Sequence, residues 1–211
     1  MSLTTYTEPD WTSIPENLEP RASVFSELPF SPTQLKALLV RLTEWHFGNP
    51  SQLYNRQLGN LQWTDSPLTT KILIGDSVTE DPKNASKRPA ICIRLDSVSP
   101  SDVYINPETL QVSIDDTPVE YPVYHKLLTG VFQAVCESTS APEAERIAEE
   151  LFRFFTGFSP AIKADAQLRD FTVTKLDGAV KREKGVERHA ATVTMTYSAN
   201  AYFRVPQEKA W

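Results

Sequence analysis

The chain has 211 residues and a mass of 23.7 kDa, enough for one complete hydrophobic core together with additional arms or loops. Its hydrophobic content of 40% and mean hydropathy of -0.34 are typical of a soluble globular protein, and no apolar run approaches the roughly 18 residues of a membrane span. The formal net charge of -6 argues against non-specific nucleic-acid binding as the main function, because phosphate contacts require a basic surface. Met1 is not followed by a signal-like apolar segment, so we expect a protein made in a reducing compartment.

The first 30 residues contain four prolines and show no hydrophobic period. Each proline fixes its own backbone and restricts the residue before it, so residues 1–30 are predicted to form an extended arm. The arm is too apolar for a pure linker. Its apolar residues include Trp11, Ile14, Leu18 and Phe25. These residues could pack either on the arm's own domain or on a neighbouring subunit, and the sequence favours neither.

A leucine-rich helix is predicted over residues 32–47. Ser31 is placed to cap it, Gln34 completes a capping box, and Gly48 follows its end. The predicted buried stripe consists of Leu35, Leu38, Leu39, Leu42 and Trp45. We assign His46, near the end of the helix, a capping or packing role rather than a catalytic one.

The segment 75–88 is polar and rich in turn residues, which predicts an exposed loop after a short strand at 71–74. Its Gly75-Asp76-Ser77 sequence matches a lipase nucleophile block only in its letters, because such a serine needs a supporting histidine, an acid and an oxyanion hole. The next segment, RPAICIRL at 88–95, is apolar on nearly both faces. That pattern is typical of a strand in the middle of a sheet covered by helices.

Residues 98–122 contain two strand-like runs, 103–105 and 110–114, separated by Asn106-Pro107. We interpret this region as a small β-hairpin inserted into the domain. Asp115-Asp116 precedes Thr117-Pro118 and is better explained as a turn than as a metal site.

Residues 129–137 alternate between two faces, which predicts a strand, and an amphipathic helix follows over 141–156. Ser140 is placed to cap this helix, with Glu143 completing a capping box, and Gly157 is placed to end it in a left-handed cap. Both cysteines, Cys92 and Cys136, fall inside apolar strand patterns, so we expect buried free thiols.

A closing hairpin is predicted from two Thr- and Val-rich strands at 168–176 and 189–202. The charged tip between them, residues 177–188, is the most basic local segment. It is equally well explained as a solvated hairpin tip or as an electrostatic docking site. Its basic residues are Lys181, Arg182, Lys184 and Arg188. Residues 203–211 form a short tail that ends in Trp211.

This order of elements predicts an α+β fold: a four-stranded, mostly antiparallel sheet flanked by two main helices, with the inserted β-hairpin and the extended N-terminal arm. The predicted organisation is an arm (1–30), a single domain (31–202) and a C-terminal tail (203–211).

The same order resembles the tail terminator proteins of long-tailed bacteriophages, small subunits that form a ring closing the tail tube. Four segments carry the resemblance: the helix 32–47, RPAICIRL, GVFQAVCESTSAPEAERIAEELFRFF, and the hairpin FTVTKL to HAATVTMTYSA. The resemblance implies a non-enzymatic virion protein, assembled in the host cytoplasm, with no catalytic, cofactor-binding or metal-binding residues. It also implies a homo-hexameric ring that contacts the tail tube protein, the sheath if the tail is contractile, and the head-tail connector.

The resemblance implies no membrane and no sequence-specific nucleic-acid binding, although DNA can pass through such a ring. The candidate interface residues are Trp11, Phe25, Lys181, Arg182, Lys184, Arg188 and Trp211. Two other interpretations are a related neck, head-completion or connector adaptor protein and, less favoured, a small cytoplasmic hydrolase. The hydrolase would use Ser77, His125 or His189 with an acid, and the scarcity of histidine and glycine argues against it.

Overall fold

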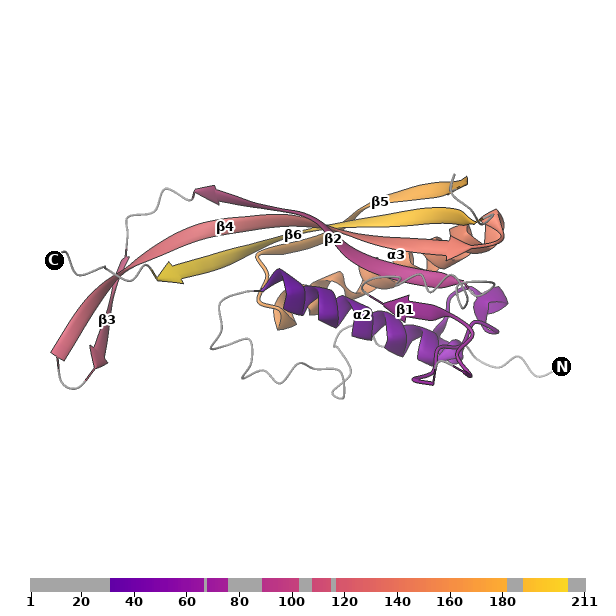
Figure 1. Ribbon diagram of the computed structural model, residues 1–211, viewed down its shortest axis with the longest axis horizontal. Helices are drawn as coiled ribbons and strands as arrows, with labels where there is room; N and C mark the ends of the chain where they lie inside the picture. Colours follow the sequence, from indigo (N-terminus) through magenta and orange to yellow (C-terminus); the bar gives the residue numbers. More distant parts are fainter. Residues whose placement is uncertain are drawn as a thin grey trace.

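The computed structural model describes residues 31–66, 68–75, 89–102, 108–114, 117–181 and 188–204. These ranges form a mixed sheet with two long helices packed on it (Figure 1). The helices are α2 (Pro32–Gly48) and α3 (Ala141–Asp165), and two short 3-10 turns follow α2, namely η1 (Pro50–Gln52) and η2 (Arg56–Leu58). The strands are β1 (Leu73–Gly75), β2 (Ala90–Asp102), β3 (Glu108–Ile114), β4 (Thr117–Ser138), β5 (Asp170–Lys181) and β6 (His189–Arg204).

The strands lie in the order β1-β2-β4-β6-β5, with β3 paired to the first part of β4. All these pairs are antiparallel except β1 with β2. The predicted α+β class is therefore confirmed, and the four predicted strands correspond to β2, β4, β5 and β6. The sheet also contains β1 and β3, so it has more strands than the prediction. The predicted arm, residues 1–30, lies outside the described residues, while Phe203 and Arg204 of the predicted tail belong to β6.

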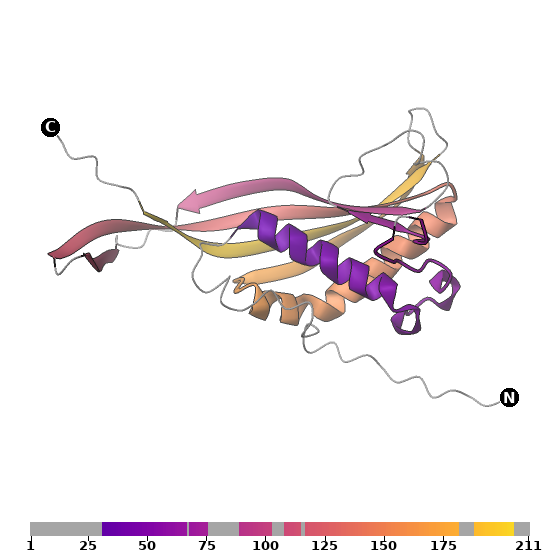
Figure 2. The ribbon, with the colours of Figure 1, turned by 60° about the horizontal axis from the view of Figure 1, so that its bottom comes forward.

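One face of the sheet carries the hydrophobic core. The register places Ile93 beside Ala134 and Ala134 beside Val193, so alternate residues of β2, β4 and β6 project together toward the helices. The fully buried residues of this layer include Ile91, Phe132, Cys136, Ala191 and Met195. Both helices cover this face (Figure 2). The four predicted leucines of α2 are buried, and Trp45 is half-buried.

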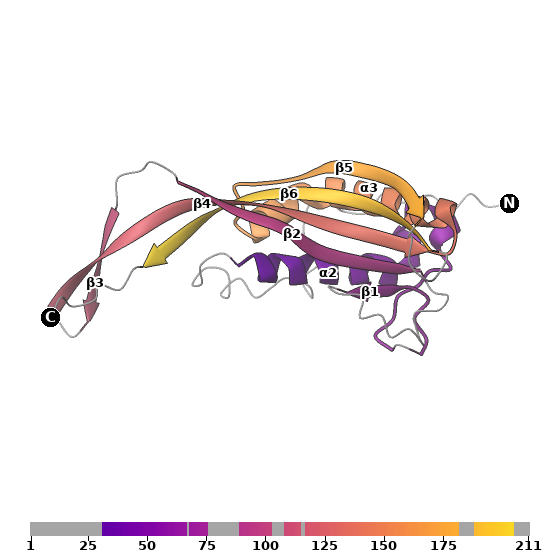
Figure 3. The same ribbon diagram turned by 45° about the horizontal axis from the view of Figure 1, so that its top comes forward.

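The opposite face of the sheet has no helix over it within the described ranges (Figure 3). The 88–95 strand lies inside the sheet, between β1 and β4, as expected, but among the described residues helices cover only one of its faces. Along this face Cys92 is half-buried and Arg94 is exposed, where the Arg94 guanidinium donates to the Gln133 side-chain oxygen over 2.5 Å. At the start of the strand this face is buried without a helix, because Ala90 is 1% exposed and its cross-strand neighbour Glu137, also 1% exposed, pairs with Arg188.

The sheet is longer than the helices that cover it. At about 3.3 Å per residue, the 22 residues of β4 span roughly 70 Å, whereas the 25 residues of α3 span about 37 Å. The N-terminal part of β4, with β3 beside it, consequently projects beyond the helices (Figure 1). We define this projecting pair, residues 108–114 and 117–123, as the β-arm.

The β-arm corrects the predicted inserted hairpin. Its two strands are β3 and the start of β4, paired from Glu108 with Val123 to Ile114 with Thr117. The run 103–105 lies outside the described residues. The first residues of the predicted hairpin, 98–102, belong to β2, which ends at Asp102. The predicted strand at 110–114 corresponds to β3, but its partner is the start of the central strand β4, so the hairpin is the end of a central strand rather than a separate insertion.

Both helices begin where the sequence predicts, but without the predicted caps. Ser31 and Ser140 occupy the N-cap positions, and neither side chain accepts a capping hydrogen bond. The Ser138 hydroxyl instead donates to the Glu143 carboxylate and accepts from the Ser140 backbone N–H over 3.1 Å. Ser138, two residues before the N-cap, therefore bridges the Ser140 N–H and the Glu143 carboxylate, which a capping box would join directly.

Helix α3 continues past the predicted stop at Gly157. Its apolar stripe extends through Phe158, Ala161 and Ile162, which are 0%, 4% and 0% exposed, so burial outweighs the cost of Gly157 and Pro160 in the helix. Pro160 lies on the exposed side, where water can solvate the Thr156 carbonyl that loses its partner. The helix ends instead at Asp165, and Gln167 beyond it, with a φ of 52° and an N–H bond to the Ala164 carbonyl, forms a left-handed cap.

Two glycine substitutions distinguish these helix ends. Gly157→Ala is expected to raise the free energy of unfolding by roughly 1 kcal/mol, because alanine is favoured over glycine inside a helix. Gln167→Gly is expected to raise it by up to about 1 kcal/mol, since glycine adopts positive φ without strain. Urea unfolding measures both. A loss of stability in Gly157→Ala would instead indicate a helix that ends at residue 157.

Candidate functional site

Five of the seven candidate interface residues lie outside the described ranges, so their positions are not described: Trp11, Phe25, Arg182, Lys184 and Trp211. Lys181 is exposed at the end of β5, where its backbone pairs with His189. The basic tip of the closing hairpin is thus represented in the structure only by its two ends.

Arg188 corrects the prediction of an exposed basic tip. Its side chain is buried, at 6% exposed, and its Nη1 lies 3.2 Å from Oε2 of Glu137, which is 1% exposed. The residue immediately precedes β6, next to the strand end that contains Glu137, so the guanidinium lies against the sheet instead of extending into solvent. A buried charge requires such a partner, and we therefore assign Arg188 a structural role.

The residues proposed for a hydrolase are not brought together by the described structure. Ser77 lies outside the described ranges, His125 lies within β4, and His189 is half-buried at the start of β6. No group of three His, Cys, Asp or Glu residues suited to a metal ion occurs in the part of the chain that the structure describes. None of its helices is long and apolar enough to cross a membrane.

The two cysteines are free, as predicted, but differ in environment. Cys136 is fully buried in the core, and burial raises the pKa of its thiol well above the ordinary value. The thiol form is therefore strongly favoured, which makes Cys136 a core residue rather than a nucleophile. Cys92 is half-buried on the uncovered face of the sheet.

A buried carboxylate joins three segments of the chain. Glu150 of α3 is 1% exposed, and its Oε1 lies 2.9 Å from His46 Nε2 at the end of α2. The backbone N–H groups of Tyr54 and Asn55 donate to Oε1 and Oε2, each over 2.9 Å. A carboxylate only accepts hydrogen bonds, so Nε2 of His46 carries the proton that it donates. We name this group the Glu150 junction, because it connects α2, the segment before η2 and α3.

His46 is held on its other side by an aromatic ring. Its imidazole stacks on Phe154, with ring centroids 4.1 Å apart and an interplanar angle of 18°. Burial lowers the pKa of His46, and the hydrogen bond and charge of Glu150 oppose that effect. The predicted packing role of His46 is confirmed.

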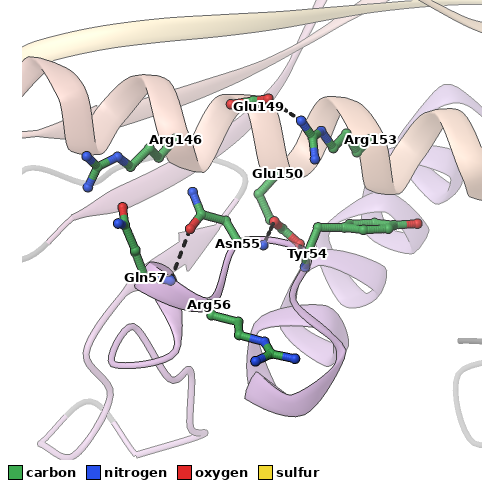
Figure 4. Close-up of a pocket in the computed structure, with 8 residues that line it drawn as sticks. All are labelled: Tyr54, Asn55, Arg56, Gln57, Arg146, Glu149, Glu150 and Arg153. Carbon is green, nitrogen blue, oxygen red and sulfur yellow. Dashed lines mark hydrogen bonds and ion pairs between the residues drawn. The ribbon is translucent and has the colours of Figure 1, made fainter. Parts of the chain in front are cut away.

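A concave pocket of about 370 Å³ lies beside the Glu150 junction, between α3 and the segment before and within η2 (Figure 4). Its lining is polar and contains three arginines. The lining residues are Tyr54, Asn55, Arg56, Gln57, Arg146, Glu149, Glu150 and Arg153. We name it the arginine pocket. Its arginine side chains are of a kind that can hold an anion.

Sequence reasoning did not identify the Glu150 junction, although one signal is present. Glu150 follows Ile147 by three residues and precedes Phe154 by four, so it falls on the apolar stripe of α3. A carboxylate on the buried side of a helix needs hydrogen-bond donors. The sequence does not reveal that two of those donors are backbone groups from an irregular segment almost a hundred residues away.

Comparisons with known proteins do not assign the chain. No family model matches it, and no curated protein matches it. The candidate surfaces are therefore judged on geometry and chemistry: the β-arm, the uncovered face of the sheet and the arginine pocket.

Removing the Glu150 carboxylate is expected to destabilise the fold strongly. Glu150→Ala leaves buried His46 and two half-buried backbone N–H groups without their acceptor, which should lower the free energy of unfolding by roughly 3 kcal/mol. Glu149→Ala is the matched control, because Glu149 is the exposed neighbour on the same helix and should change stability by less than about 0.5 kcal/mol. Equal effects of the two substitutions in urea unfolding would contradict the junction.

The lowered pKa of His46 predicts a pH effect on stability. The unfolded chain protonates His46 near the ordinary pKa of 6.5, and the folded chain only at lower pH. Stability contributed by neutral His46 is therefore present above about pH 6.5 and decreases as the pH falls toward the folded pKa. His46→Gln retains a donor without titrating, so the decrease in unfolding free energy between pH 7.5 and 5.5 should be smaller in this variant. The same decrease in both proteins would contradict the assignment.

Proposed function

We propose that the chain is a ring-forming structural subunit, the tail terminator of a long-tailed bacteriophage, which caps the tail tube and supplies the head-tail joining surface. The observation that carries the proposal is the excess length of the sheet. A two-stranded ribbon is marginally stable in water by itself, and the β-arm extends beyond the helices that bury the rest of the sheet. A neighbouring subunit or the tube would provide the missing packing surface.

The residue types along the β-arm support an intermolecular contact. The register places Leu110 opposite Tyr121 and Val112 opposite Val119, whereas Gln111 is opposite Glu120. Apolar types therefore share one set of alternating positions, and polar types share the other. This pattern is typical of a sheet with one face against a partner and one face in water.

The uncovered sheet face is a second surface suited to assembly. Thr192, Thr194 and Thr196 of β6 are half-buried on it, opposite the helices. A closed ring requires two different patches on each subunit that fit each other. The β-arm and the uncovered face are two such patches at different places on one chain. A related neck or connector adaptor would use the same surfaces, and tube binding distinguishes it from a terminator.

The function is tested by adding the protein to purified tail tubes that are still competent to elongate. We expect a ring of about six subunits at one end of each tube and no further addition of tube protein there. Tubes that continue to elongate, with no ring bound, would contradict the terminator assignment.

The β-arm provides a matched pair of variants for this assay. Val112→Asp places a charge at an apolar position and is expected to reduce capped tubes by about tenfold or more, whereas Gln111→Asp, at a polar position, should leave capping unchanged. Unfolding of the helix-covered part should be unchanged in both. Alanine at Ser77, His125 and His189 should leave capping intact, although it would abolish an enzyme that uses these residues.

A further inference from the structure

We infer that the arginine pocket binds the acidic N-terminal segment around Trp11 of a neighbouring copy of this chain. The inference rests on the proposed ring, because the neighbour that donates the segment is the next subunit. It assigns one specific contact to the ring, which neither the β-arm nor the uncovered sheet face supplies.

Two of the three arginines in the pocket carry charge that no ion pair among the described residues uses. Glu149 is paired with Arg153, with 2.5 Å between the Glu149 Oε1 and Arg153 Nη2 atoms. Glu150 is occupied by the three donors of its junction. Arg56 and Arg146 form no ion pair with any residue that the structure describes. The two guanidinium groups come from opposite walls, Arg56 from η2 and Arg146 from α3 (Figure 4).

The walls of the pocket are held in place before any ligand arrives. The wall that contains Arg56 is fixed through the Glu150 junction at Tyr54 and Asn55, and by the Gln57 N–H, which donates to Asn55 Oδ1 over 3.0 Å. Leu53 and Leu58, on either side of these residues, are 3% and 2% exposed and anchor the segment to the core. A preorganised site loses little conformational entropy on binding, so two exposed arginines can contribute more than they would on a mobile loop.

The N-terminal segment has the complementary chemistry. Residues 1–30 contain five carboxylates and one arginine, a formal charge of -4, although the whole chain carries only -6. Glu8 and Asp10 lie on either side of Pro9 and directly precede Trp11. Carboxylates form bidentate hydrogen bonds with arginine, and an aromatic side chain packs on guanidinium faces. The volume of about 370 Å³ lies within the usual range of roughly 300–1,000 Å³ for ligand pockets.

Reach and symmetry favour a neighbouring copy as the donor. Trp11 precedes Ser31 by 20 residues, which span at most about 70 Å when extended, whereas α2 is only about 25 Å long. The segment can therefore pass beyond its own subunit. A ring with heterologous contacts needs two different surfaces that fit each other, and an acidic segment with a basic pocket on the same chain provides such a pair.

Photo-cross-linking in the full-length protein tests the inference. Trp11 is replaced by p-benzoylphenylalanine, and isotopically light and heavy chains are mixed before assembly. Mass spectrometry of the irradiated assembly then identifies the cross-linked peptides. We expect cross-links from light chains to heavy peptides that contain residues 54–57 or 146–153. Arg146→Glu should reduce their yield by about fivefold or more, and Glu8→Arg with Asp10→Arg in that background should restore it.

Arg41→Glu is the matched control, because Arg41 is an exposed arginine of α2 outside the pocket, and it should not change the yield. Cross-links confined to single chains would overturn the assignment to a neighbour. Cross-links that avoid the pocket, or that do not respond to Arg146→Glu, would overturn the pocket itself. Cross-linking as expected in a protein that does not cap tail tubes would support this contact and reject the terminator function.

Discussion

The mismatch between sheet and helix length is the constraint on which the rest of the structure depends. Two residues of strand extend farther than four residues of helix, so a 22-residue strand cannot be covered by one 25-residue helix that crosses the same sheet. The chain covers one end of the sheet with α2 and α3 and leaves the other end as the β-arm. The covered end has a continuous core from Leu35 to Ala199 and accounts for the stability of the fold, while the projecting end is available for contacts with other molecules.

The covered end is completed by a polar interaction rather than by apolar packing alone. The segment between α2 and β1 has little regular structure, and its backbone N–H groups need acceptors where they approach the core. Glu150 supplies one carboxylate for two of these groups and for His46, which ties the irregular segment to both helices. The same connection fixes one wall of the arginine pocket. The Glu150 side chain therefore contributes to stability and also positions one wall of the proposed docking site.

Local patterns of the sequence predict the fold well where one interaction dominates. The leucine stripe of α2, the strand-to-helix corner at Ser140 and the order of the four main strands follow from hydrophobic period and capping positions. The end of α3 does not follow from these local patterns. Three buried apolar residues after Gly157 keep the chain helical, although Gly157 and Pro160 ordinarily end helices. The structural roles of Arg188 and Glu150 also depend on partners far away in the sequence. Local residue spacing does not predict such pairs.

The central claim, that this chain assembles as a closed ring, is tested most directly by its mass in solution, measured by light scattering together with negative-stain images of the same fraction. The account predicts particles near six subunits with a central opening, formed by the protein alone or on contact with tail tubes. A protein that remains monomeric by mass, and that shows no ring in images either alone or with tail tubes, would contradict it.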